Sequence, residues 1–280
     1  MEMDYFQRME RRINRLEAGV PEALGDKSYT RPFADMIGVR TPELLFQGSL
    51  VELLEFSFPE EFVLKPRYLS TSKGVYLLRK SGRDFESLTT GESLTLAQLE
   101  RTYMELAENH FSDPRMGEYL VEELLRDDDG TTPPVDIRAY MFQGVCGFVL
   151  VEDHMHEKTR ATYFNGDFSP MLDVAERFGV AERATHLEEI IERRAPSNAT
   201  EILAVANRIS IAVPSAFCRV DMYNTGVKVY LGEITFFPGT FYYRNRKLMS
   251  RKEAERLGKL WAAAEGRLHG SLLVPAPNQE

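Results

Sequence analysis

The chain has 280 residues, of which 43% are hydrophobic and 28% charged, which is typical of a globular protein with one large domain or two lobes. The formal net charge of −9 argues against nucleic acid as the main partner, because binding to phosphates needs a concentrated basic surface. No stretch reaches the roughly 18 to 20 apolar residues of a membrane span, and the acidic N-terminal segment is not a secretory signal, so we expect a cytoplasmic protein.

The predicted elements begin with helices, continue with a small β-rich region and end with a larger mixture of strands and helices. Helices are expected at residues 3–18, 26–40 and 96–111, and strands at 62–65, 75–78, 119–125, 136–142 and 145–151. Further along, we expect helical structure over 170–211 with a break at 195–197, a hairpin over 218–239 and a terminal helix over 251–268. Hairpins in place of βαβ repeats favour an α+β fold with antiparallel sheets. Cys146 and Cys218 lie in apolar runs and are expected to be free, buried thiols.

The hairpin carries two carboxylates, Asp221 and Glu233, one in each strand of a mostly apolar segment. Acids are depleted in strands and are rarely buried unless they are paired or bound to a cation. Depending on the length of the turn, the alternation predicts that the two acids are offset by two or by four residues. At the larger offset, a shared metal site requires a β-bulge, for which Gly232 is a candidate. The pair therefore indicates a metal site, two acids on a solvated sheet face, or two acids that are each paired with a base such as Arg219 or Lys228.

Other polar residues lie at strand ends and admit two interpretations each. Lys65 ends an apolar strand and is followed by the loop RYLSTSKG, which contains Lys73; ammonium groups and loop N–H groups suit a polyphosphate. A lysine at this place is also typical of an edge strand. Asp136 and Arg138 share one face of a strand, where they suit a ribose and a phosphate or simply form a structural ion pair.

Taken in order, these segments resemble the ATP-grasp superfamily, and within it the TupA-like branch, named for teichuronopeptide biosynthesis. The matching stretches cover roughly residues 20 to 245: DKSYTRPFADMIGVRTPELL, PEEFVLKP, YLVEELL, DIRAYMFQG and FCRVDMYNTGVKVYLGEITFFPGT. The resemblance implies two lobes whose antiparallel sheets clamp a nucleotide. We accordingly expect residues 1–45 to form an N-terminal helical segment, 46–120 the small lobe and 121–280 the large lobe with the metal site.

The resemblance also implies a role for each matching residue. Phosphate contacts would come from Lys27, Lys65 and Lys73, and the adenine edge would meet the main chain around Glu122, Glu123 and Leu125. Asp136 would bind the ribose, with Arg138 beside it. Mg²⁺ on ATP would be held by Asp221, Glu233 and Thr235, and Arg219 would face the transferring phosphoryl group.

The sequence departs from the superfamily pattern in three places. Many members of the superfamily have an asparagine at the position of Thr235, whereas the TupA-like branch has threonine there, as this sequence does. The loop RYLSTSKG is poor in glycine. Only about 25 residues precede Asp26, so we expect the N-terminal Rossmann-like lobe to be missing or reduced. A loop with His154 and His156 beside Glu152 and Asp153 is a weak metal candidate, and a charged surface loop is the simpler interpretation.

The function that the resemblance implies is an ATP-dependent carboxylate–amine ligase that forms an acyl phosphate, serving cell-envelope polysaccharide or specialised peptide synthesis. Its substrates would be small-molecule, peptide or saccharide carboxylates and amines, and a partner chain or oligomer stays open. One alternative is a kinase that phosphorylates an alcohol of a metabolite or sugar. Another is a non-catalytic nucleotide-binding protein. An acyl phosphate trapped as a hydroxamate distinguishes the ligase from the kinase.

Overall fold

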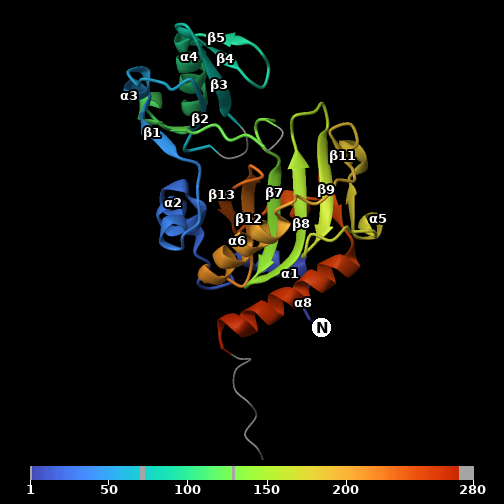
Figure 1. The fold of residues 1–280 in the computed structure, drawn as a ribbon. Coiled ribbons are helices and arrows are strands. Elements are labelled where there is room, and N and C mark those ends of the chain that lie inside the picture. The colour runs from blue at the N-terminus through green and yellow to red at the C-terminus, as the bar shows by residue number, and fades with distance from the viewer. Residues whose placement is uncertain (1, 70–72, 128–129, 271–280) are drawn as a thin grey trace, which may run out of the picture. The chain divides into compact units, whose positions relative to one another are not determined.

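The computed structural model describes residues 2–69, 73–127 and 130–270, and the chain forms two compact units (Figure 1). The larger unit comprises residues 1–41 and 135–280, and the smaller unit comprises residues 42–134. Each unit combines helices with a six-stranded sheet, which confirms the predicted α+β class. Among the described residues, no helix has the length and apolar character needed to cross a membrane.

The smaller unit contains an antiparallel sheet with the strand order β1-β6-β2-β3-β4-β5. The strands are β1 (Leu44–Ser49), β2 (Glu61–Pro66), β3 (Tyr76–Ser81), β4 (Asp84–Ser87), β5 (Ser93–Leu94) and β6 (Glu118–Glu122), and the helices are α3 (Leu50–Leu54), α4 (Leu96–Ala107) and the 3₁₀ turn η2 (Pro114–Met116). Phe62 and Leu64 alternate with less buried residues along β2 and pack into a core with Tyr103 of α4. The predicted strands 62–65 and 75–78 and the helix at 96 are confirmed.

The larger unit contains a sheet with the order β11-β9-β8-β7-β12-β13 and a two-stranded sheet of β10 and β14. The strands are β7 (Asp136–Phe142), β8 (Val145–Asp153), β9 (Thr159–Asn165), β10 (Phe178–Val180), β11 (Glu188–Ile190), β12 (Cys218–Asn224), β13 (Val229–Thr235) and β14 (Lys247–Met249). The helices are α1 (Tyr5–Ile13), η1 (Glu22–Gly25), α2 (Lys27–Met36), α5 (Val174–Arg177), η3 (Glu182–Ala184), α6 (Ala199–Ala212), α7 (Gly239–Tyr242) and α8 (Arg251–Leu268). The turn between β7 and β8 uses positive φ at Gln143 and Gly144, as expected for a tight hairpin.

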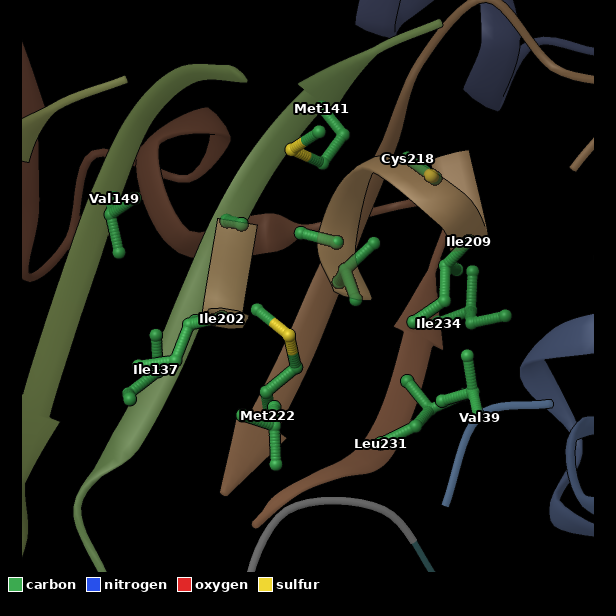
Figure 2. Close-up of a cluster of buried hydrophobic side chains, with 14 of the residues drawn as sticks. Val39, Ile137, Met141, Val149, Ile202, Ile209, Cys218, Met222, Leu231 and Ile234 are labelled. Carbon is green, nitrogen blue, oxygen red and sulfur yellow. The ribbon is translucent and has the colours of Figure 1, made fainter. Parts of the chain in front are cut away.

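Helices cover both faces of the larger sheet, and alternation along each strand assigns its residues to one face or the other. Ile137 and Met141 of β7 pack with Ile202 and Ile209 of α6, as Figure 2 shows. The opposite face packs against α1 and α8 through residues such as Tyr140, Phe142, Trp261 and Tyr5. We call these the α6 face and the α1–α8 face. Arg138 has the parity of Tyr140 and therefore lies on the α1–α8 face.

The prediction of helical structure over 170–211 is correct only for α6, the single turn α5 and the short 3₁₀ helix η3. Residues 178–180 and 188–190 form strands β10 and β11 instead, pairing with β14 and β9. Local periodicity cannot show this, because the partners of both strands lie elsewhere in the sequence. Both cysteines are free thiols, and burial raises the pKa of each to about 12.

Candidate active site

The hairpin of β12 and β13 places Asp221 directly opposite Glu233. The pairing passes from Met222–Leu231 to Asp221–Glu233, so Gly232 is the extra residue of a β-bulge. Leu231 belongs to the core on the α6 face, whereas Glu233, after the bulge, shares the α1–α8 face with Asp221. The candidate bulge is confirmed, but both predicted offsets between the acids are wrong.

Arg219 lies two residues before Asp221 on β12 and grips its carboxylate with two hydrogen bonds. Its Nε and Nη2 donate to the two oxygens of Asp221 at 2.6 and 2.5 Å. The guanidinium also donates to the hydroxyls of Thr235 at 3.2 Å and Thr240 at 3.1 Å. Burial would lower the pKa of Arg219, but the charge of Asp221 outweighs it and holds that pKa above its ordinary value. The guanidinium is therefore a permanent cation in a fixed orientation.

Glu233 lies in a crowded electrostatic environment although much of the residue is exposed. Its pKa is raised, first because the surrounding protein displaces water and second because the charge of Asp221 repels a second carboxylate. The cations of Arg219, Lys27 and Arg138 act in the opposite direction. Four residues that the sequence predicts for the nucleotide and metal site, Lys27, Arg138, Arg219 and Asp221, thus act electrostatically on the fifth, Glu233, within the larger unit.

The donors at this place fit Mg²⁺, a hard cation that prefers oxygen ligands. Opposite residues of antiparallel strands have Cβ atoms about 4.5–5.5 Å apart, close enough for Asp221 and Glu233 to share an ion. A bound cation would also remove the repulsion that raises the pKa of Glu233. The described parts of the chain hold no cluster of three or more His, Cys, Asp or Glu residues suited to a metal. Further ligands would therefore come from the Thr235 hydroxyl, water and the nucleotide.

Arg138 of β7 lies directly opposite Asp221 of β12 in the sheet. Together with Glu233, these residues form a charged row across β7, β12 and β13 on the α1–α8 face. Its Nη2 donates to Asp136 at 2.9 Å, and its Nη1 forms an ion pair with Glu152. The Nε2 atom of His154 lies 3.3 Å from the Asp136 carboxylate. Burial raises the pKa of Asp136, but His154 and Arg138 lower it by more, so its pKa lies below the ordinary value. Asp136 is therefore an ionised hydrogen-bond acceptor at neutral pH.

A buried charge network behind Arg138 is absent from the sequence prediction. The Nζ of Lys247 lies 2.8 Å from Glu152 and 2.5 Å from Glu188, and all three side chains are almost fully buried. Burial lowers the pKa of Lys247 in spite of these partners. Breaking a buried, paired network leaves an uncompensated charge, which is costly. We therefore expect the network to hold Glu152 in place, and Glu152 in turn to fix the position of Arg138. Strands β11 and β14, which supply Glu188 and Lys247, have no local signal that reveals their pairing.

The loop that follows β8 does not gather a metal site around its two histidines. His154 points to Asp136, and the Nε2 of His156 lies 3.3 Å from Asp153, which also pairs with Arg193. Glu152, the other acid proposed for this cluster, is turned toward Arg138 and Lys247. The simpler interpretation, a charged loop with ion pairs, agrees with these contacts.

The predicted nucleotide residues of the smaller unit lie on β2, β6 and the segment after β6. Lys65 of β2 forms an ion pair with the buried Glu122 of β6. The carboxylate of Glu123 accepts from the backbone N–H of Glu43 at 2.9 Å, and the backbone oxygen of Leu125 accepts from the Thr132 hydroxyl at 2.9 Å. Lys73 lies in the turn before β3, whereas residues 70–72 of the predicted phosphate loop are outside the described residues.

The two sheets and the charged row on the larger one define an α+β protein with a carboxylate pair suited to a metal–nucleotide complex. The family model of TupA-like ATP-grasp proteins matches residues 17–260, so the chain belongs to the TupA-like ATP-grasp family. This confirms the resemblance and the predicted ATP-grasp fold. A search of curated proteins found no significant match.

Several solved ligases are similar in structure at low sequence identity. D-alanine–D-alanine ligase from Bacillus anthracis is 16% identical, with 88% of this chain and 68% of that chain covered and a TM-score of 0.45. The corresponding ligase from Helicobacter pylori is 13% identical, with 96% and 69% covered and a TM-score of 0.47. The ATP-grasp ligase PsnB, complexed with precursor peptide PsnA2 and AMPPNP, is 11% identical, with 87% of this chain covered and a TM-score of 0.45. The chain spans 59% of the length of PsnB, which is less than two thirds.

Proposed function

We propose that the protein is an ATP-dependent ligase that joins a carboxylate to an amine through an acyl phosphate. The observation that carries the proposal is the alignment of Asp221 with Glu233 beside the fixed cation Arg219, in a chain of the ATP-grasp family. Activating a carboxylate with ATP brings several negative charges together, so the site must supply positive charge in fixed positions. The match of residues 17–260 to the TupA-like ATP-grasp family supports ATP-dependent chemistry.

In this proposal, Asp221, Glu233 and Thr235 hold Mg²⁺. The ion would neutralise charge on the β- and γ-phosphates as the phosphoryl group is transferred. Arg219 binds an oxygen of the transferring phosphoryl group or of the attacking carboxylate through the second N–H of Nη1, since the contacts described above use its other four N–H groups. Its bonds to Thr235 and Thr240 fix the plane of that guanidinium.

We assign the remaining nucleotide contacts by residue type. Lys27, Lys65 and Lys73 are proposed to bind phosphate oxygens, and Asp136 to accept from the ribose hydroxyls. Arg138 binds phosphate, held in position by Glu152. The backbone from Glu122 to Leu125 is proposed to meet the adenine edge, and the side chains of Glu122 and Glu123 are engaged in the contacts described above.

The same proposal covers the lobes and the setting of the reaction. We assign residues 46–120 to the small lobe, 121–280 to the large lobe and 1–45 to an N-terminal segment. The separate hydrophobic core of the smaller unit supports a lobe in that part of the chain. We propose that the enzyme acts in the cytoplasm, in cell-envelope polysaccharide or specialised peptide biosynthesis.

The test combines ADP release with trapping of the intermediate. Purified protein is incubated with MgATP and panels of carboxylates and amines, with and without hydroxylamine. We expect ADP release that needs a carboxylate, and a hydroxamate when hydroxylamine replaces the amine. ADP release with an alcohol substrate and no hydroxamate would instead establish the kinase, and no MgATP binding would reject both enzymes.

A further inference from the structure

A cavity of about 290 Å³ opens in the larger unit where the chain after α1 meets the segment after β13. It lies wholly within this unit and is lined mainly by two charged and several apolar or aromatic residues: Ile13, Arg15, Glu22, Phe237, Tyr242 and Tyr243. Its volume is just below the roughly 300–1,000 Å³ of small-molecule sites. The cavity therefore suits a ligand of the size of one amino acid rather than a nucleotide.

The wall of the cavity presents one cation and one anion side by side. Arg15 forms an ion pair with Glu22, and their side chains are 67% and 40% exposed, so both are accessible to a ligand. The guanidinium of Arg15 also lies 5.5 Å from the ring centroid of Phe237. A ligand with one carboxylate and one ammonium can exchange with this pair without leaving a charge unbalanced, whereas a ligand with a single charge cannot.

The cavity is joined to the proposed reaction site by the short helix α7. Gly239 of α7 lines the cavity, and the next residue, Thr240, accepts a hydrogen bond from Arg219 at 3.1 Å. Arg219 in turn holds Asp221 with two hydrogen bonds. A molecule bound in the cavity thus lies next to the element that contacts the arginine of the reaction site.

We propose that this cavity binds the amine substrate of the ligase, an amino acid with an apolar side chain. Its carboxylate pairs with Arg15, its ammonium pairs with Glu22, and its side chain packs on Phe237, Tyr242 and Tyr243. The inference rests on the proposed function for the fate of the bound amine, but the binding itself is measured without turnover.

The experiment is calorimetric titration of the intact protein with L-phenylalanine, with and without Mg²⁺ and AMPPNP. 3-Phenylpropionate and phenethylamine serve as matched probes that lack the ammonium and the carboxylate, respectively. We expect L-phenylalanine to bind about 10- to 100-fold more tightly than either probe, as for loss of one charged hydrogen-bonding group. Equal affinity for all three compounds, or no binding of L-phenylalanine in either condition, would overturn the proposal.

Two variants test which residue of the cavity binds each charged group of the ligand. Arg15→Gln should abolish the preference for L-phenylalanine over phenethylamine, because it removes the partner of the ligand's carboxylate. Glu22→Gln should abolish the preference over 3-phenylpropionate, because it removes the partner of the ligand's ammonium. The control Arg251→Gln removes an exposed arginine whose ion pair with Glu255 lies on α8, and it should leave all three affinities unchanged. Unchanged preferences in both cavity variants would reject the site. Binding of L-phenylalanine without any ATP-dependent product would retain the cavity and reject the ligase, and the reverse result would retain the ligase and reject the cavity.

Discussion

At the scale of single residues, Asp221 is the group on which the proposed site depends most. It contacts Arg219 through both oxygens, lies opposite Glu233 on one neighbouring strand and opposite Arg138 on the other. A carboxylate with this many charged neighbours is either structural or a ligand. The position of Glu233 directly opposite Asp221 favours the second interpretation. Burial first and the charge of Asp221 second raise the pKa of Glu233, and a bound cation would relieve the repulsion between the two acids.

Replacing Asp221 with asparagine separates these interpretations. Asparagine keeps the size of the side chain and one oxygen for Arg219, but it removes the charge that compensates the largely buried guanidinium. We therefore expect the variant to fold, with a free energy of unfolding lower by about 1–3 kcal/mol, and activity is compared well below its unfolding temperature. Removing residues that only orient a metal ligand costs about 10–100-fold, so loss of a ligand should lower Mg²⁺-dependent ATP consumption by about 100-fold or more. The control Glu86→Gln alters an exposed acid of β4 that pairs with Arg79. Normal turnover in Asp221→Asn would rule out its role as a ligand.

Asp136 gives a prediction for the dependence of stability on pH. Its pKa in the folded state lies below the ordinary value of 3.8, mainly because the contacts of His154 and Arg138 outweigh burial. The ionised group therefore stabilises the fold above pH 3.8, and this contribution disappears as the pH falls through the folded-state pKa.

We expect Asp136→Asn to lower the free energy of unfolding at pH 7 by about 1–3 kcal/mol, as for hydrogen bonds to charged groups. Urea titrations from pH 7 to pH 2.5 should show the difference from wild type shrinking below pH 3.8. Asp35→Asn, at an exposed position of α2, serves as the control. A deficit that stays constant down to the lowest pH would show that the contacts of Asp136 do not depend on its charge.

At the scale of elements, the β-bulge at Gly232 decides which face of the sheet receives Glu233. A Cβ at this position would lie 2.9 Å from the ring of Tyr223 and 3.3 Å from the backbone oxygen of Asp221. Without the bulge, alternation would place Leu231 and Glu233 on the same face.

Gly232→Ala should therefore destabilise the protein by about 1–3 kcal/mol, the usual cost of overpacking, and weaken Mg²⁺ binding because Asp221 and Glu233 no longer align. Urea unfolding and titration with Mg²⁺ in the presence of AMPPNP measure the two effects. Gly179→Ala in β10 is the matched control, since its Cβ would meet no atom closer than 4.0 Å. Wild-type stability and Mg²⁺ affinity in Gly232→Ala would show that the bulge does not set the geometry of the acids.

The sequence predicts those elements whose signals are local. The turns at Gln143–Gly144 and at Asn224 follow from residues that favour them, and both flanking hairpins are present. By contrast, β10 and β11 form only because distant strands pair with them, and a helical pattern over the same residues is misleading. The network of Lys247 with Glu152 and Glu188 is unpredictable for the same reason. The position of the bulge could be predicted from Gly232, but the pairing register of β12 with β13 could be determined only from the structure.

At the scale of the whole molecule, the family match spans residues 17–260 and therefore includes parts of both compact units. Each unit has its own hydrophobic core, and each carries part of the predicted nucleotide set. A chain with a net charge of −9 still gathers the cations of Lys27, Arg138 and Arg219 around two carboxylates. Such a local concentration of both signs suits a metal–polyphosphate complex, which itself carries both signs.

The most direct measurement is a crystal structure of the protein grown with Mg²⁺ and AMPPNP. We expect an ion with oxygens of Asp221 and Glu233 at about 2.0–2.1 Å, bound also to phosphate oxygens of the nucleotide. A nucleotide whose metal ion is coordinated elsewhere, with both carboxylates free of it, would show that Asp221 and Glu233 are not the metal ligands.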